Sequence, residues 1–375
     1  MLSLQIMAMM ETIGNESMRA LMASAVREGR VSHAQMIVAP DGYGALAVAI
    51  EYACSVLGID RGSIFSCPDL HFAYPVNTTK DIKKDPVSDD FAPQWRQFVG
   101  ENLYGSLRDW YQMIDIENKQ GNISIREAEK IASKLSLKSY GGGYRVMIIW
   151  HGEKMNNEAA NKLLKLIEEP GEKTLILLVT ADAGAILPTI ASRMQAVELR
   201  RPARSDIETF LQERGVDRDT AGVIARECDG DVGRALELSM GQDDDSPYGE
   251  LFVRFVRSAF MAKKNAGELN NLMAWADDVA RLPRESQKQF IQYVYGVFRA
   301  ALMSSYGLEA MGRVGGLPQG FNFASFCNYV HSRNIRAIYD LLSDAAFHIE
   351  RNASPRLTFM DMAVKITRLL HTKAV

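Results

Sequence analysis

Apolar runs alternate with amphipathic stretches over roughly the first two hundred residues. Short runs predict strands, most of them apolar on both faces, at residues 34–40, 66–76, 141–150, 174–181 and 196–202. Helical spacing of apolar positions predicts helices between them, at residues 17–29, 45–58, 124–139 and 156–172. Such alternation is typical of a parallel sheet covered by helices on both sides. The pattern therefore predicts an α/β domain over residues 1–202.

The pattern changes after Pro202, where strand signals stop. Residues 203–242 predict about three short helices, which we interpret as a small helical domain. The acidic run Asp243–Asp245 followed by Pro247 predicts a linker. Long amphipathic segments then fill residues 243–375 and predict an all-α bundle. The expected organisation is thus three domains.

Residues 77–122 interrupt the strand–helix alternation and read as an insertion in the first domain. The segment mixes polar, charged and aromatic residues, with Trp95, Tyr104, Trp110 and Tyr111 among them. We expect these aromatic side chains to pack the insertion onto the domain rather than to contact DNA.

Composition excludes several classes of protein. Among 375 residues, 43 Lys and Arg oppose 46 Asp and Glu, a net charge of −3 that excludes a histone-like polycation and argues against strong autonomous binding of nucleic acid. The four cysteines are scattered, which excludes a disulfide scaffold and fits a reducing cytosol. We see no signal peptide and no apolar run near the roughly 18 residues of a membrane span, so we expect a cytoplasmic protein without a membrane partner.

The first strand leads into a degenerate phosphate-binding loop. A working loop reads G-x-x-x-x-G-K-[ST], in which Lys neutralises the terminal phosphates and the hydroxyl holds Mg²⁺. Here Gly42 and Gly44 are present, but Ala45 stands at the Lys position and Leu46 at the Ser/Thr position. Neither side chain can bind phosphate or metal. Judged by local sequence alone, a plain strand–helix turn that needs glycine is the better interpretation.

The acidic residues expected of a nucleotide hydrolase are missing as well. Such an enzyme carries acids at the end of a strand like residues 145–150, where they hold Mg²⁺ and orient water. Here that strand ends in Trp150 and His151, and Glu153 is displaced along the loop. We interpret Glu153 as a solvated residue before a helix. The joint loss of lysine, hydroxyl and acids indicates a fold that has lost its chemistry.

The stretch from Tyr144 to Met194 resembles the clamp-loader ATPases of bacterial replication, within the AAA+ superfamily. The loop at Ala45 and Leu46 is similar to that of the delta-prime branch, whose nucleotide site is degenerate, rather than to the gamma/tau motor branch, which keeps Lys and Thr. The motifs that carry the resemblance are Met155-Asn156, Ala159–Lys165, Glu168-Glu169-Pro170, Leu175–Thr180 and Leu187–Met194, flanked by Gly29–Ala34, Pro68-Asp69 and Ile125–Glu127.

The resemblance implies roles for a few residues. In the family, the Ser-Arg-Cys element places an arginine finger against ATP bound by the neighbouring subunit. The matching residues here are Ser192 and Arg193, with Met194 in place of Cys. Without the flanking motif, Arg193 would be interpreted as part of a surface salt bridge. Thr180 matches the sensor 1 position, where we expect it only to pack or to cap a turn.

Arg234 matches the sensor 2 position of the helical lid, and an ion pair between domains is an equal alternative. Related chains often carry a four-cysteine zinc module after the first helix. The corresponding region here has only Cys54 and Cys67, with His71 nearby. Because a structural zinc site needs four ligands, we expect no metal, and we place Cys54 inside a buried helix.

The resemblance thus implies an AAA+ domain, a helical lid and a collar that assembles a ring of subunits. It implies a non-hydrolysing stator of the DNA polymerase III clamp loader with gamma/tau and delta subunits as partners. Contact with the sliding clamp and primed DNA would run through the complex. We expect no cofactor, since ATP would be bound by neighbouring subunits. The alternatives are an active gamma/tau-like ATPase and an interaction scaffold outside replication.

Overall fold

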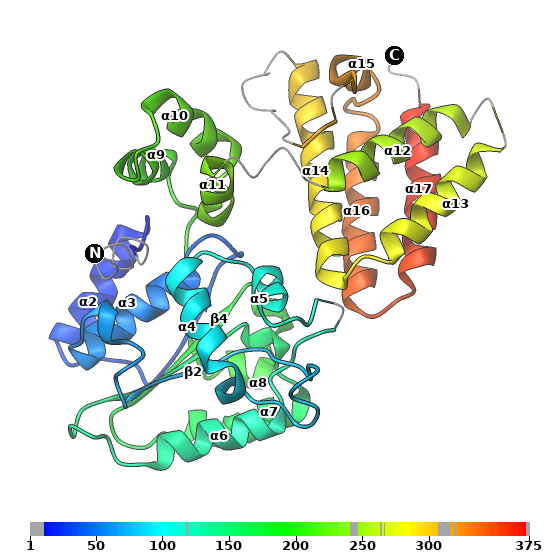
Figure 1. The fold of residues 1–375 in the computed structure, drawn as a ribbon. Coiled ribbons are helices and arrows are strands. Elements are labelled where there is room, and N and C mark those ends of the chain that lie inside the picture. Colours follow the sequence, from blue (N-terminus) through cyan, green and yellow to red (C-terminus); the bar gives the residue numbers. More distant parts are fainter. Residues whose placement is uncertain are drawn as a thin grey trace. The chain divides into compact units, whose positions relative to one another are not determined.

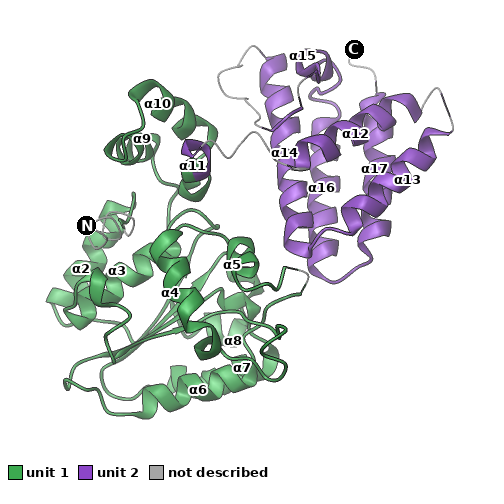
Figure 2. Cartoon of the chain, viewed as in Figure 1, with its two compact units in different colours: residues 1–236 green, residues 237–375 purple. Residues whose placement is uncertain are grey.

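The computed structural model describes residues 11–240 except 118, and residues 247–372 except 263, 264, 266, 307–315 and 319. The chain divides into two compact units, residues 1–236 and 237–375 (Figure 2). The predicted linker at Asp243–Asp245 lies outside the described residues. The three short helices after Pro202 belong almost entirely to the first unit, so the boundary that we expected at residue 202 separates parts of one compact unit.

A five-stranded sheet forms the centre of the first unit, in the order β2-β3-β4-β1-β5. Every pairing between neighbouring strands is parallel, as the apolar runs predict. The central strand β4 is buried along its whole length because helices cover both faces of the sheet. The strands are β1 (Ala34–Val38), β2 (Leu70–Ala73), β3 (Arg145–Trp150), β4 (Thr174–Thr180) and β5 (Gln195–Glu198).

Helices cover the two faces of this sheet as Figure 1 shows. Alternate side chains of the strands, among them Met36, Met147 and Ile176, pack against α6, α7 and α8 in one apolar core. Helix α3 packs on β1, β3 and β4 from the opposite face, and α2 packs on α3. These helices are α2 (Glu16–Arg27), α3 (Ala45–Leu57), α6 (Ile125–Ser136), α7 (Asn157–Glu168) and α8 (Pro188–Ala191).

The insertion at residues 77–122 carries α4 (Ala92–Glu101) and α5 (Leu107–Met113) and packs against the β2–β3 side of the sheet. Trp95 stacks on Tyr74 with ring centroids 4.1 Å apart and also contacts Trp110 and Trp150. Its four predicted packing residues, Trp95, Tyr104, Trp110 and Tyr111, are all buried. The expectation that they hold the insertion on the domain is confirmed.

Three short helices follow the sheet: α9 (Arg204–Glu213), α10 (Arg218–Glu227) and α11 (Val232–Ser239). Helices α9 and α10 pack against each other, and the apolar side chains buried in them include Ile207, Leu211, Ala221 and Ala225. We refer to residues 203–240 as the lid.

The second unit is helical throughout its described residues, as predicted. Phe252, Phe290, Phe298 and Phe359 lie at the centre of its apolar core. None of the described helices in either unit is long and apolar enough to cross a membrane. The helices of the second unit are α12 (Pro247–Ala262), α13 (Glu268–Ala280), α14 (Arg284–Ser305), α15 (Phe323–Cys327), α16 (Ile335–Glu350) and α17 (Pro355–Leu370).

Candidate functional site

The loop between β1 and α3 turns at two glycines with positive φ angles. Gly42 and Gly44 have φ angles of 79° and 88°, a backbone conformation that residues with a side chain rarely adopt. Gly44 precedes α3, and its carbonyl accepts a hydrogen bond from the Val48 amide at 2.9 Å. Ala45 and Leu46, at the two chemical positions of the motif, are both buried in the first turn of α3.

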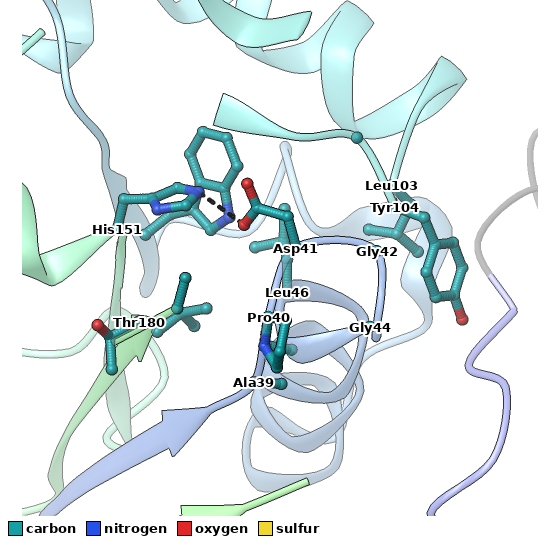
Figure 3. Close-up of a pocket in the computed structure, with 15 residues that line it drawn as sticks. Ala39, Pro40, Asp41, Gly42, Gly44, Leu46, Leu103, Tyr104, His151 and Thr180 are labelled. Atoms are coloured by element: carbon teal, nitrogen blue, oxygen red, sulfur yellow. Dashed lines mark ion pairs between the residues drawn. The ribbon is translucent and has the colours of Figure 1, made fainter. Parts of the chain in front are cut away.

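Little room remains above this loop. The cavity there has a volume of about 20 Å³, enough for roughly one water molecule. Figure 3 shows the loop, His151, Thr180 and Tyr104 around it. A nucleotide needs a pocket more than ten times larger, on the order of 300 Å³. The site in this conformation is therefore filled by the protein itself.

Tyr104 from the insertion is one of the residues that fill the site. A Cβ atom on Gly44 would lie 2.9 Å from Cε1 of the Tyr104 ring, so the ring rests directly on the loop. The Tyr104 hydroxyl accepts a hydrogen bond from the Ile13 amide at 2.8 Å and donates one to the Glu11 carbonyl at 2.9 Å. Burial raises the pKa of Tyr104, so the ring stays a neutral phenol.

The lid closes the loop from another side. The Val232 amide donates a hydrogen bond to the Gly42 carbonyl at 2.9 Å, and Asp231 lies so close that a Cβ on Gly42 would fall 1.9 Å from its Oδ1. Asp231 also accepts a hydrogen bond from the Arg234 amide at 2.8 Å and so caps α11. Arg234, matched to the sensor 2 position, is therefore in the first turn of the helix that touches the loop. Its two possible roles stay open.

The positions that carry acids in a hydrolase hold a buried polar network. His151, with a φ angle of 52°, lies between two carboxylates: Nδ1 is 2.6 Å from Glu153 Oε1, and Nε2 is 3.4 Å from Asp41 Oδ1. The Thr180 hydroxyl donates to Glu153 Oε2 at 2.6 Å. The prediction that Glu153 is solvated is wrong, because its side chain is only 8% exposed.

Charges within this network shift the pKa values of Glu153 and His151. Burial opposes ionisation of Glu153, but the charge and hydrogen bond of His151 and the hydroxyl of Thr180 prevail and lower its pKa to about 2. Burial likewise opposes protonation of His151, yet the charges of Asp41 and Glu153 raise its pKa. Thr180, which also accepts a hydrogen bond from the Asp182 amide, does more than cap a turn, since it positions Glu153.

Arg193 follows α8 and is exposed. Its Nε lies 2.7 Å from Glu168 Oε1, with the two side chains 42% and 45% exposed, and its guanidinium also donates to the Thr189 carbonyl at 2.9 Å. The Ser192 hydroxyl donates to the same carbonyl at 3.3 Å. Met194 is buried and anchors the segment in the core.

Arg193 and the loop between β1 and α3 lie at opposite ends of the sheet. The loop follows the carboxyl end of β1, whereas Arg193 comes two residues before the amino end of β5, which runs parallel to β1. Five residues of strand separate these edges by roughly 15 Å. Arg193 therefore cannot serve a phosphate at its own chain's loop.

Sequence reasoning missed two residues that close the site, Asp41 and Tyr104. The sequence analysis gives Asp41 no role. Asp41 follows the strand at residues 34–40 and His151 follows the strand at residues 141–150, and parallel strands end at the same edge of a sheet, so the two residues could have been expected to lie close together. Tyr104 gave no signal for its contact with the loop, because it comes from the insertion. Of the cysteines, Cys54 is buried in α3 as predicted, and burial raises its pKa to about 11. Within the described residues, no cluster of three or more His, Cys, Asp or Glu side chains could hold a metal.

Comparison with known proteins agrees with these motifs. A family described as DNA polymerase III, delta subunit, matches residues 104–203, which include His151, Thr180 and Arg193. DNA polymerase III subunit delta' of Bacillus subtilis is 26% identical over 223 residues, covering 60% of this chain and 58% of that protein. These matches support a clamp-loader subunit of the AAA+ family.

Two further matches cover more of this chain. Subunit tau of B. subtilis is 22% identical over 97% of the chain and 62% of its own. A gamma subunit-related protein of Thermotoga maritima, solved as a crystal structure, is 16% identical with a TM-score of 0.41 and covers 92% of this chain and 98% of that one. This chain spans less than two thirds of the length of either B. subtilis relative.

Proposed function

We propose that this clamp-loader subunit is a delta-prime-like stator that neither binds nor hydrolyses ATP and supplies Arg193 to ATP on a neighbouring subunit. In this proposal its partners are gamma/tau and delta subunits. The assembled complex, rather than this chain alone, contacts the sliding clamp and primed DNA and loads the clamp with ATP.

The first half of this proposal, that the chain neither binds nor hydrolyses ATP, is supported by the side chains that line the loop between β1 and α3. Ala45 and Leu46 offer no charge or hydroxyl, and Tyr104 lies on Gly44 where phosphates would approach the loop. The cavity of about 20 Å³ leaves no space for a nucleotide without movement of Tyr104 and the lid. A subunit built in this way can hold one shape while its neighbours cycle through ATP.

The second half rests on the placement of Arg193. A guanidinium is always charged, and its planar fork matches phosphate oxygens. Arg193 is exposed, lies at the edge of the sheet away from its own loop, and is engaged only by an exposed ion pair and a carbonyl among the contacts described above. Exposed ion pairs contribute roughly 0–1 kcal/mol, so exchanging Glu168 for a phosphate costs little.

Nucleotide titration of the isolated full chain tests the first half. Calorimetry with Mg²⁺ and ATP should show no saturable binding in the micromolar range, while B. subtilis tau in the same assay serves as the positive control. Micromolar binding by this chain would overturn the assignment and favour the gamma/tau-like ATPase.

Co-purification separates the stator from a scaffold outside replication. The tagged chain should retain gamma/tau and delta subunits from the same cells in a defined complex. Exposed Ser192 and Arg193 favour the stator, because a scaffold has no use for an arginine aimed at a neighbour's phosphate. Recovery of the chain without any clamp-loader subunit would favour the scaffold.

A further inference from the structure

Three separate elements bring polar side chains to His151. Asp41 comes from the loop after β1, Glu153 from the turn after β3, and Thr180 from the end of β4. Figure 3 shows the imidazole facing Asp41 across the mouth of the site. Since these segments also carry the motif positions of a nucleotide site, the network ties together the parts that a bound nucleotide would contact.

The geometry favours a charged imidazole. Nδ1 makes a 2.6 Å hydrogen bond with one carboxylate oxygen, and Nε2, which makes no hydrogen bond, lies 3.4 Å from another, so each ring nitrogen is within ion-pair distance of a carboxylate. A neutral ring carries a single N–H, and its other nitrogen would turn a lone pair toward a carboxylate. His151 is only 3% exposed, so water cannot relieve that repulsion.

The other groups around His151 leave this charge pattern in place. Lys154, on the same turn, is the cation that opposes protonation, and the two carboxylates outweigh it. From β4 the network receives the uncharged hydroxyl of Thr180, and Trp150 places its ring edge-to-face with the imidazole at 4.2 Å. From α5, the Leu107 amide donates to Asp41 Oδ2 at 3.3 Å and fixes that carboxylate.

We propose that His151 is a built-in cation that positions the degenerate loop, holding Asp41 against Glu153 and Thr180 so that the vacated site stays closed in the absence of any ligand. In this role the imidazolium occupies the electrostatic place that lysine and metal ion take in an active site. We call the contacts among His151, Asp41, Glu153 and Thr180 the brace. The brace lies within one chain and does not depend on Arg193 or on assembly.

The brace has a defined pH range. The raised pKa of His151 means that its contribution to stability is fully present below 6.5, the ordinary value, and is lost as pH rises through the folded-state value. The lowered pKa of Glu153 gives a contribution that is fully present above 4.5 and lost as pH falls toward about 2. The loop is therefore held most firmly between these limits and loosens on the alkaline side.

Nitrogen-15 NMR of the imidazoles in the full chain, without nucleotide, tests the charge directly. The His151 ring, assigned by comparison with His151→Gln, should carry protons on both nitrogens at about pH 7 and titrate above 6.5. A single ring N–H at that pH, with titration at or below 6.5, would overturn the proposal.

Hydrogen exchange of residues 39–46 tests the positioning role. At about pH 6 the loop of His151→Gln should exchange faster than that of the wild type, and the difference should shrink toward about pH 9. Asp41→Asn, a milder change, should give the same trend. His33→Gln is the matched control, because the His33 ring bonds the Ile167 carbonyl at 3.1 Å rather than carboxylates.

A loop difference that does not depend on pH, or equal loop exchange in all the variants, would contradict the brace. The measurement uses no nucleotide, clamp or other subunit. The result of this hydrogen-exchange experiment therefore does not depend on whether the chain acts as a stator.

Discussion

Two ion pairs in the first unit have nearly the same length and opposite surroundings. His151 and Glu153 lie 2.6 Å apart with side chains 4% and 8% exposed, whereas Arg193 and Glu168 lie 2.7 Å apart with side chains 42% and 45% exposed. Water screens the exposed pair and stabilises its separated charges, but does neither for the buried pair. Burial, rather than distance, therefore makes one pair part of the structure and leaves the other free to change partners.

The largest expected effect comes from breaking the buried pair. Glu153→Gln keeps the shape of the side chain but leaves the imidazolium without its closest carboxylate, and should lower the free energy of unfolding by about 3–5 kcal/mol. Urea unfolding followed by tryptophan fluorescence measures this. A Trp275→Phe background restricts the signal to Trp95, Trp110 and Trp150 in the first unit.

Acid should remove that same contribution. Because the pKa of Glu153 falls to about 2 in the folded state, the difference between wild type and Glu153→Gln should be constant between pH 4.5 and 6.5, where His151 stays charged, and should shrink as pH falls toward about 2. A loss below about 1 kcal/mol at neutral pH, or a difference that does not shrink in acid, would show that the buried pair behaves like a surface pair.

A smaller effect is expected where the lid touches the loop. In Gly42→Ala the new Cβ would lie 1.9 Å from Asp231 Oδ1, so Asp231 must move and lose the hydrogen bond that it accepts from the Arg234 amide. Loss of such a cap costs about 0.5–2 kcal/mol, in addition to the strain of a positive φ angle.

Gly29→Ala is the matched control for that substitution. Gly29 has a φ angle of 65° and no atom within 4 Å of the added Cβ, so the control isolates backbone strain. The two variants should differ in unfolding free energy by the cost of the lost cap. Equal losses would mean that the lid does not bear on the loop in solution.

The smallest effect is expected at the exposed pair. Glu168→Gln removes the carboxylate next to Arg193 and should change the unfolding free energy by about 1 kcal/mol or less. The same urea experiment measures it. A loss as large as that of Glu153→Gln would mean that Arg193 is tied to its own chain and would argue against its use in trans.

The sequence predicts the fold well because its strands are continuous apolar runs and its helices are amphipathic. The runs at 34–40 and 174–181 become β1 and β4, and Gly58 ends α3 with a φ angle of 66°. The absence of a lysine and a hydroxyl at the two motif positions can also be read directly from Ala45 and Leu46. These features depend on near neighbours in the chain.

The buried network around His151 depends on contacts between distant segments and could not be read in the same way. Glu153 looks solvated in sequence because it follows a strand and precedes a helix. Its burial arises from His151 beside it and from Thr180, 27 residues away. Tyr104 meets Gly44 only because the insertion folds back over the loop. Strand order fixes Arg193 at the far edge of the sheet, a placement that the motif alone does not give.

ATP hydrolysis by the reconstituted loader containing Arg193→Ala tests the central claim most directly. Glu168→Gln serves as the control that disturbs only the ion pair, and Arg193→Lys keeps the charge but loses the planar fork. If Arg193 acts on a neighbour's ATP, Arg193→Ala should assemble normally yet lower turnover at the site that it serves by about 10³-fold. Arg193→Lys should be impaired as well, and Glu168→Gln should match the wild type. Unchanged ATP hydrolysis and clamp loading with Arg193→Ala would contradict the account.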